Sequence, residues 1–374
     1  MNRWMHVVRG LALASALALC APGGAAFARA DESAPLKVIL VDVEGGAATL
    51  YVTPQGHSLL IDAGWPTGVG GPRPEPGKPA PAPLDGPARI VAAAKAAGLS
   101  RIDYLVITHY HVDHVGGLAD LLKLIPVGAI IDHGPNREMP SGDASPAMQR
   151  FAPATLYPAY LEAIAGLPRR SMKAGETLRI DDLDLTAVVS DKAVIAKPLP
   201  GAGKAGTGCA EATSKAEDGG EENARSLGFL MRWGEARLLA LGDTTWDVEN
   251  RLVCPVNRIG TVDFYIADNH GSDTSNSPTF LNNIRPRITV INNGPRKGAD
   301  AAVFDTVRAA PGREALWQLH SAERSPDKNE PDDRIINLAG GEDGRSLEIE
   351  VARDAALTVI NTRTGHRETY RRHP

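Results

Sequence analysis

Three histidines and one aspartate fall within six residues of this chain, directly after an apolar segment. The segment is 101–107, and the polar residues are His109, His111, Asp113 and His114. Imidazole and carboxylate groups are the ligands that divalent metals such as Zn²⁺ prefer. Alternate side chains of an extended loop can point to one side together, whereas several polar rings buried side by side are costly without a partner. The cluster therefore predicts a metal site at the end of a strand.

Around this cluster the chain alternates between strand-like and helix-like segments. Residues 36–64 hold three segments rich in β-branched residues, broken by turns that contain Gly, which predicts an antiparallel meander. A strand that runs into a His-rich loop is expected at 101–111, and a strand followed by a loop at 127–135. Further strands are expected at 176–190, 226–233, 236–243, 262–268, 287–294 and 315–320, helices at 88–99, 116–126, 154–167, 278–284 and after Thr245, and a hairpin at 346–371. Because each half combines a sheet with the helices that follow it, the pattern predicts a layered α/β (α+β) sandwich.

Two segments interrupt this pattern. Residues 65–87 are rich in Pro and Gly and cannot sustain a strand ladder, so they are expected to form an exposed loop. Residues 191–222 are rich in Gly, Ala, Lys and Glu and have no periodicity. Both are predicted to be loop insertions at the mouth of the site, within a single domain that spans 31–374.

The first thirty residues have the three-part order of a secretory signal peptide. Arg3 and Arg9 are followed by an uncharged apolar run at 10–21 and then by Ala28-Arg29-Ala30. The run is too short to cross a bilayer, and a buried N-terminal helix is the alternative. We expect cleavage near Ala30 and an exported protein, periplasmic or secreted. No other long apolar run exists, so no transmembrane segment is expected in the mature protein.

Removing the signal peptide changes the charge and leaves two cysteines. The basic residues fall from 40 to 37 against 45 acidic ones, so the formal charge changes from −5 to −8. This acidity argues against long nucleic acid as a partner and favours a small-molecule substrate. Cys209 and Cys254 are candidates for a disulfide, because paired cysteines commonly bridge in an oxidising compartment, and two buried free thiols are the alternative.

The metal-site pattern resembles a known family. The HxHxDH motif is followed by Gly116-Gly117, preceded by LIDAG at 60–64, and followed far downstream by LGD at 241–243 and HGS at 270–272. This combination resembles the metallo-β-lactamase-fold hydrolases. More narrowly, the segments VDVEGGAATL, NARSLGFL, LALGD and NHGSDTSNSP resemble the metallo-hydrolase domain of bacterial competence (DNA-uptake) proteins. The resemblance covers roughly residues 36–320 and implies a four-layer αββα sandwich.

The resemblance also implies a site with two divalent metals, Zn²⁺ being favoured over Mn²⁺ or Fe²⁺. The implied ligands are His109 and His111 for the first metal, Asp113, His114 and His270 for the second, and Asp243 as a bridge between them. Asp62 would accept a hydrogen bond from the loop that carries the ligands. In such a site the nucleophile is a hydroxide held between the metals, with Asp113 and Asp243 as catalytic carboxylates.

The chain departs from the family pattern at two places. The wider family takes a third His for the first metal from the loop before the GD strand, but residues 222–226 contain none. His133 is our candidate replacement, and a loop His bonded to backbone is the alternative. Asn269 stands where the competence-type pattern has His, which affects substrate orientation more than metal binding. His320, at the end of the strand at 315–320, is a candidate general acid, and a structural His is the alternative.

The function expected from these residues is hydrolysis. A bridging carboxylate at Asp243 is a feature of phosphodiesterase-, thioesterase- and lactonase-like branches more than of true β-lactamases. We therefore expect an exported metal-dependent hydrolase of a phosphodiester or other small ester. Arg296 and Lys297 are candidates to bind an anionic substrate group, with solvated loop charges as the alternative. The alternative functions are hydrolysis of a lactam or lactone, and non-catalytic ligand binding at an incomplete metal site. The sequence does not indicate the oligomeric state.

Overall fold

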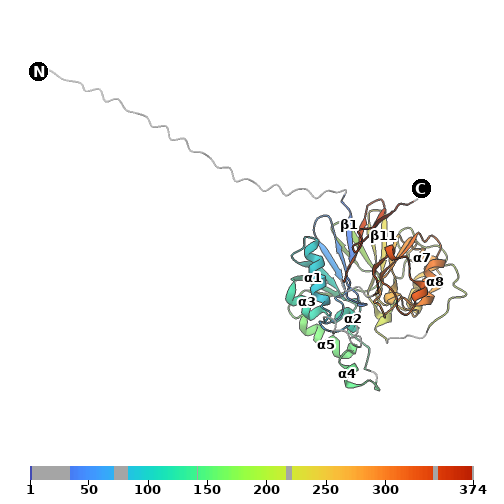
Figure 1. Cartoon of the computed structure of the whole chain (residues 1–374), viewed down its shortest axis with the longest axis horizontal. Coiled ribbons are helices and arrows are strands. Elements are labelled where there is room, and N and C mark those ends of the chain that lie inside the picture. The colour runs from blue at the N-terminus through green and yellow to red at the C-terminus, as the bar shows by residue number, and fades with distance from the viewer. Residues whose placement is uncertain (2–33, 71–82, 141, 216–220, 340–343, 373–374) are drawn as a thin grey trace.

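The computed structural model of the chain describes residue 1 and residues 34–70, 83–140, 142–215, 221–339 and 344–372. Apart from Met1, the expected signal peptide at 1–30 lies outside the described residues, as do residues 71–82 and 216–220 of the two expected insertions. Two sheets of nine strands each face one another (Figure 1). Within the described residues, no helix is both long and apolar enough to cross a membrane.

The first sheet combines the N-terminal strands with the last three strands of the chain. Its spatial order is β18 (Arg367–Tyr370), β17 (Leu357–Asn361), β16 (Leu347–Val351), β1 (Leu36–Leu40), β2 (Thr49–Val52), β3 (Ser58–Ile61), β4 (Ile102–Val106), β5 (Val127–Asp132) and β6 (Arg169–Ser171). The strands from β18 to β3 are antiparallel, and those from β3 to β6 are parallel. The parallel strands therefore direct their following loops to one edge of the sheet.

The second sheet has the same division into an antiparallel and a parallel part. Its spatial order is β15 (Ile335–Asn337), β14 (Ala315–His320), β13 (Ile288–Ile291), β12 (Phe264–Ile266), β11 (Ala236–Ala240), β10 (Gly228–Trp233), β8 (Leu183–Ser190) and β7 (Thr177–Ile180), and β9 (Ala193–Val194) pairs with β8. The strands from β11 to β15 are parallel. Loops that carry polar residues follow β11, β12 and β13.

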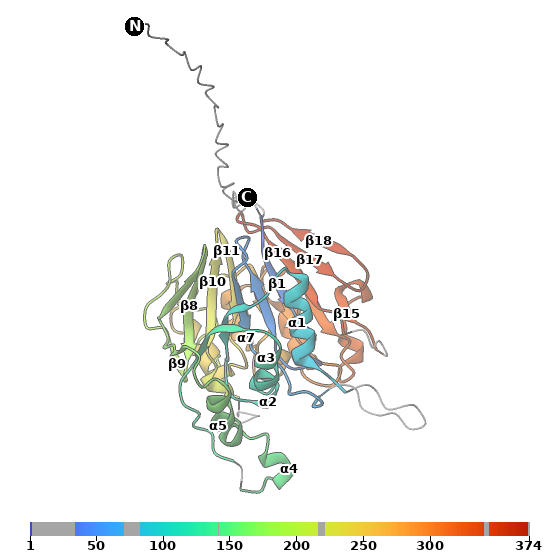
Figure 2. The same cartoon turned by 90° about the vertical axis from the view of Figure 1, so that its left-hand side faces the viewer.

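Helices cover the outer face of each sheet. The first sheet is covered by α1 (Gly86–Ala96), α2 (Val112–Val115), α3 (Leu118–Leu124) and α5 (Pro153–Ala163), and the second by α6 (Trp246–Val253), α7 (Pro278–Ile284) and α8 (Ala301–Ala309). The short helix α4 (Pro146–Gln149) buries none of its residues. Short 3₁₀ turns lie at η1 (Asn223–Arg225), η2 (Asp268–Gly271), η3 (Pro326–Lys328) and η4 (Asp332–Arg334). Figure 2 shows α4 lying beyond α5, away from the sheets.

Three apolar cores separate these layers. One lies between the sheets and contains Val106 and Trp317. A second lies between the second sheet and its helices and contains Leu252, and a third lies between the first sheet and its helices and contains Ile90. Central strands such as β3 and β13 are buried on both faces, whereas β16 and β17 alternate between buried and partly exposed residues. The expected four-layer αββα sandwich is confirmed.

Helix α8 is the longest element that the sequence analysis did not anticipate. It buries Val303, Phe304 and Val307 against the second sheet, which is helical spacing. The preceding loop is rich in Gly and Asn, so the amphipathic stretch is short and has weak flanking signals. The strand expected to run into a His-rich loop at 101–111 is present, because β4 ends at Val106 and the His-rich segment forms a loop and then α2.

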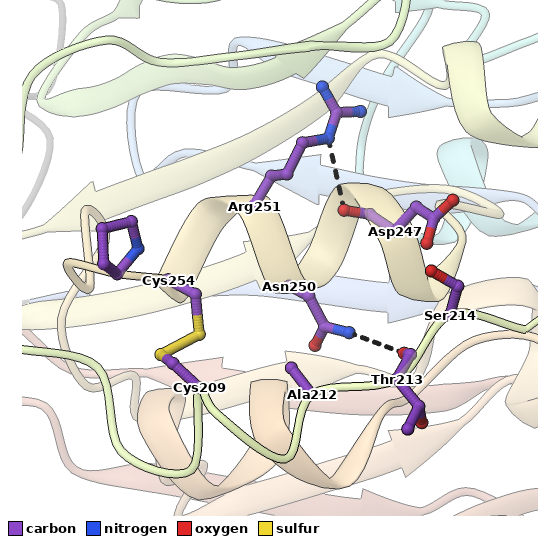
Figure 3. Close-up of a pocket in the computed structure, with 9 residues that line it drawn as sticks. Cys209, Ala212, Thr213, Ser214, Asp247, Asn250, Arg251 and Cys254 are labelled. Atoms are coloured by element: carbon purple, nitrogen blue, oxygen red, sulfur yellow. Dashed lines mark hydrogen bonds between the residues drawn. A yellow bond between two sulfur atoms is a disulfide. The ribbon is translucent and has the colours of Figure 1, made fainter.

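The insertion at 191–222 is held along helix α6. Cys209 and Cys254 form a disulfide with a Cα–Cα distance of 5.6 Å. Beside it, Asn250 donates from Nδ2 to the carbonyl oxygen of Thr213 at 3.1 Å (Figure 3). Residues of the insertion and of helix α6 line an open pocket of about 590 Å³. The described part of this insertion is therefore anchored to α6 by a covalent bond and by hydrogen bonds.

Candidate metal centre

The polar loops that follow parallel strands of both sheets meet at one place. The loop after β4 carries His109 and His111 and leads into α2, whereas Asp243 follows β11 and His270 follows β12. Gly242 allows the loop after β11 to lie close to the loop after β4. It has a φ of +68°, and a Cβ there would lie 3.0 Å from the Cβ of Thr108, so the turn requires glycine. The topology thus joins ligands that are far apart in the sequence.

Four of the predicted ligands converge on one point. Asp113, His114, Asp243 and His270 are buried, and each offers an atom within 4.8 Å of the others. The Nε2 atom of His270 lies 3.1 Å from Asp113 Oδ2 and 3.2 Å from His114 Nε2. The latter atom lies 3.2 Å from Asp243 Oδ1. Neighbouring ligands of a tetrahedral zinc ion are about 3.4 Å apart, given metal–ligand bonds of about 2.0–2.2 Å. The cluster therefore fits a metal of this kind.

Hydrogen bonds orient the imidazoles of His114 and His270 so that one lone pair of each faces the point where the four ligands converge. His114 donates from Nδ1 to Asp62 Oδ2 at 2.8 Å, and His270 donates from Nδ1 to the carbonyl oxygen of Asn292 at 3.0 Å. Each Nε2 is then free to act as a ligand. Two such nitrogens only 3.2 Å apart repel one another unless a cation or a proton lies between them. His114 and His270, with Asp243, line a cavity of about 40 Å³, which has room for a metal ion and a water molecule.

The charges of the cluster are strongly coupled in the metal-free protein. Burial alone would lower the pKa of His114, but the carboxylates of Asp243 and Asp62 raise it to about 10. Burial would raise the pKa of Asp243, but His114 and His270 lower it to about 2. Burial lowers the pKa of His270. The carboxylates of Asp243 and Asp62 therefore favour the protonated form of His114, and a metal bound at its Nε2 would take the place of that proton.

The first-metal residues lie beside this cluster in a looser arrangement. His109 Nε2 is 3.0 Å from His111 Nδ1 and 3.9 Å from Asp243 Oδ2. The other oxygen of Asp243 faces His114, so this carboxylate lies between the two sets of ligands. Burial lowers the pKa of His109 well below its usual range, which keeps the imidazole neutral and able to bind a metal. Asp243 thus occupies the position that a bridging ligand requires.

Glu138 is a site residue that the sequence analysis missed. Its Oε2 lies 3.6 Å from His111 Nε2 and accepts a hydrogen bond from the backbone N–H of Glu222 at 2.8 Å. Burial would raise the pKa of Glu138, but His111 and the backbone of Glu222 lower it. Glu138 is therefore a charged neighbour of His111, at a separation longer than the hydrogen bond between Asp62 and His114. It comes from an irregular loop after β5, where no local pattern could have indicated it.

His133 lies near the site but has a different partner from the one expected. Its Nε2 is 3.0 Å from Glu222 Oε2, and both side chains are buried. The same oxygen accepts the backbone N–H of Tyr110 at 3.2 Å. Within the described part of the chain, His133 does not belong to either group of residues with metal-ligand spacing. Glu222 thus links His133 to the loop of the HxHxDH motif.

His320 and Asn269 also have partners outside the ligand cluster. His320 Nε2 is 2.7 Å from Asp42 Oδ1, in a separate buried group with Glu44, and Arg89 Nη1 binds Asp42 Oδ2 at 3.0 Å. Burial alone would lower the pKa of His320, but the Asp42 carboxylate raises it. Asn269 donates from Nδ2 to Thr274 Oγ1 at 3.1 Å. The structure therefore pairs His320 with Asp42, in a group separate from the four converging ligands.

Lys297 is the cation that lies closest to the ligands. Its ammonium contacts Asp113 Oδ2 and lies 5.1 Å from the centre of the Trp65 ring. The side chain keeps 35% of its surface exposed. Its charged end is desolvated among the groups of the site, and this burial lowers the pKa of Lys297 to about 7. The amino group of Lys297 therefore stands where the second metal would meet Asp113.

Comparisons with known proteins identify the fold family. A family model described as the metallo-beta-lactamase superfamily matches residues 41–291. A metal-dependent hydrolase of the β-lactamase superfamily is 12% identical, with 85% of this chain and 99% of that chain covered and a TM-score of 0.45. The metallo-β-lactamase fold protein YhfI from Bacillus subtilis is 12% identical, with 84% and 99% covered and a TM-score of 0.42. A diphosphatase from the PhnP family is 14% identical, with 85% and 99% covered and a TM-score of 0.38. No curated protein matches the chain.

The role of Asp62 can be tested by replacing Asp62 with Asn. The amide keeps the shape but removes the negative charge that orients His114, so the affinity for the second metal should fall by about 10- to 100-fold. Zinc titration of the metal-free protein measures this. Asp181→Asn is the matched control, because Asp181 accepts a hydrogen bond from His57 at 2.9 Å in an exposed pair on the protein surface. Unchanged zinc affinity in Asp62→Asn would contradict the assignment.

The pair between His320 and Asp42 predicts a pH-dependent stability. Its stabilisation should be fully present below the unfolded pKa of His320, 6.5, and should be lost as the pH rises through the raised folded pKa. His320→Gln should therefore lower the free energy of unfolding by about 2 kcal/mol near pH 6. The loss should become smaller in alkaline solution, as measured by denaturant unfolding. A loss that grows with pH would refute the pairing, and His57→Gln, in the exposed pair with Asp181, should change little at any pH.

Proposed function

The chain belongs to the metallo-β-lactamase superfamily, and from this premise we propose that it is an exported zinc hydrolase of phosphodiesters or other small esters. Its buried His/Asp metal site is that of a metal-dependent hydrolase in this superfamily. The observation that carries the proposal is the convergence of Asp113, His114, Asp243 and His270 at zinc-ligand spacing. Burying two carboxylates and two imidazoles together is costly unless a cation binds them.

Some residues of the site would bind the metals, and others orient the metal ligands. Bound zinc ions would lower the pKa of water toward neutrality and polarise the scissile group. Asp243 faces both sets of ligands, with Oδ1 toward His114 and Oδ2 toward His109. Asp62 fixes His114, and Glu138 lies against His111, so both imidazoles are held in place by carboxylates. No side-chain nucleophile is required by this arrangement.

Three features support a phosphodiester or small ester as the substrate. Asp243 faces both sets of predicted ligands, and a bridging carboxylate is a feature of phosphodiesterase-like branches more than of true β-lactamases. The motifs at 41–50 and 269–278 are similar to those of competence-protein metallo-hydrolases. The expected mature charge of −8 disfavours long DNA, so we propose a small substrate.

Export is supported by features outside the metal site. Residues 1–30 have the basic, apolar and small-residue order of a signal peptide. The disulfide between Cys209 and Cys254 is a kind of bond that persists in oxidising compartments. We therefore propose that the mature protein begins near residue 31 and acts in the periplasm or outside the cell.

The function is tested by loading the purified mature protein with zinc and measuring both metal content and turnover. We expect about two zinc ions per chain, as in other two-metal hydrolases, and hydrolysis of an activated phosphodiester. Asp243→Ala should lose metal and reduce turnover by about a thousandfold, which corresponds to the several kcal/mol that metal ions contribute. Asp247→Asn, four residues later on helix α6, is the matched control and should retain both.

The same panel should contain lactams and lactones. Their hydrolysis without turnover of any phosphodiester would overturn the proposed substrate and favour the lactam or lactone alternative. A protein that takes up no zinc and nevertheless binds its ligand would overturn the enzymatic function altogether.

A further inference from the structure

A backbone hydrogen bond joins the loop after β13 to the turn that carries the predicted metal ligand His270. The backbone N–H of Ala299 donates to the carbonyl oxygen of His270 at 2.9 Å. Gly298, which has a φ of +69°, lies so close that a Cβ there would meet the same oxygen at 2.0 Å. The backbone N–H of Gly294 donates to the carbonyl oxygen of Lys297 at 3.0 Å and closes the turn. Lys297 is therefore held at the metal site by its own backbone, and the close packing permits only glycine at 298.

The Lys297 ammonium contacts one particular oxygen of the ligand cluster. That oxygen, Asp113 Oδ2, lies 3.1 Å from His270 Nε2 and 3.3 Å from His114 Nε2. It is thus the oxygen that faces the position of the second metal. A dication and an ammonium close to the same oxygen repel one another. The contact with Lys297 and the binding of the second metal therefore oppose each other.

Other cations near the site have carboxylates of their own. Arg89 binds Asp42 at 3.0 Å, and Arg296 binds Glu323 at 2.6 Å. Within the described residues, the acidic partner recorded for Lys297 is Asp113 alone. When a metal takes Asp113, the ammonium of Lys297 loses its counterion while the Trp65 ring still lies beside it. An anionic group at the mouth of the site would replace that counterion.

We propose that Lys297 exchanges partners, binding Asp113 when the second metal position is empty and binding an anionic oxygen group of the substrate when the metal holds Asp113. This inference rests on the two-metal hydrolase function proposed above. It identifies the substrate class more closely, because the group beside the scissile bond must carry negative charge, as a phosphodiester does.

The first part of the proposal is tested by zinc titration of the metal-free mature protein. Lys297→Gln removes the competing cation, so it should bind the second zinc at least about tenfold more tightly than the wild type. Arg296→Gln is the matched control, since it removes a neighbouring cation that is paired with Glu323, and it should bind zinc as the wild type does. Equal zinc affinity in Lys297→Gln and the wild type would overturn the proposal.

The second part is tested by calorimetric titration of the zinc-loaded protein with inorganic phosphate. Lys297→Gln should bind phosphate about tenfold more weakly, whereas Lys297→Arg should retain most of the affinity because it restores the charge. Phosphate binding by Lys297→Gln that equals that of the wild type would overturn the proposal. A wild-type protein that binds no zinc in the first titration would instead refute the proposed function, so the two failures can be distinguished.

Discussion

The site depends on one constraint, which is that two carboxylates and two imidazoles are buried together at a single point between the sheets. Asp113 and Asp243 are at most 5% exposed, as are His114 and His270. Removing such groups from water costs several kcal/mol each, and hydrogen bonds alone do not offset this cost. In the metal-free protein, a proton on His114 and the ammonium of Lys297 neutralise part of the charge. A divalent metal would neutralise it more completely, because it binds all four groups at once.

The two sheets bring these groups together through the ends of their parallel strands. Asp62 follows β3 and the HxHxDH loop follows β4 in the first sheet, whereas Asp243 and His270 follow β11 and β12 in the second. The apolar core between the sheets fixes the distance between these two edges. The burial of residues such as Trp317 is therefore what holds the ligands from different sheets at bonding distance.

The metal ligands could be predicted from the sequence, but most of their hydrogen-bond and ionic partners could not. The HxHxDH motif lies in one loop and the short helix α2 that follows it. Asp62, Asp243 and His270 lie in segments that resemble a known family. Lys297 was expected to bind an anionic group, but its contact with Asp113 was not expected. Glu138 reaches the site from an irregular loop, and only the packing of the fold shows that it does. For the same reason the sequence did not reveal the partner of His133, which is Glu222, 89 residues away. His320 ended a strand as expected, but its pairing with Asp42 across the fold was not visible in the sequence.

The central claim is that Asp243 lies between two metal ions, and anomalous diffraction at the zinc edge from crystals grown with zinc tests it most directly. The account predicts two anomalous peaks about 3.5–4 Å apart, as in other two-metal sites. The zinc ion at one peak should be bound by Asp113, His114 and His270, and the zinc ion at the other by His109 and His111. Each ion should also bind one oxygen of Asp243. A single peak, or two peaks that Asp243 does not bridge, would contradict the account.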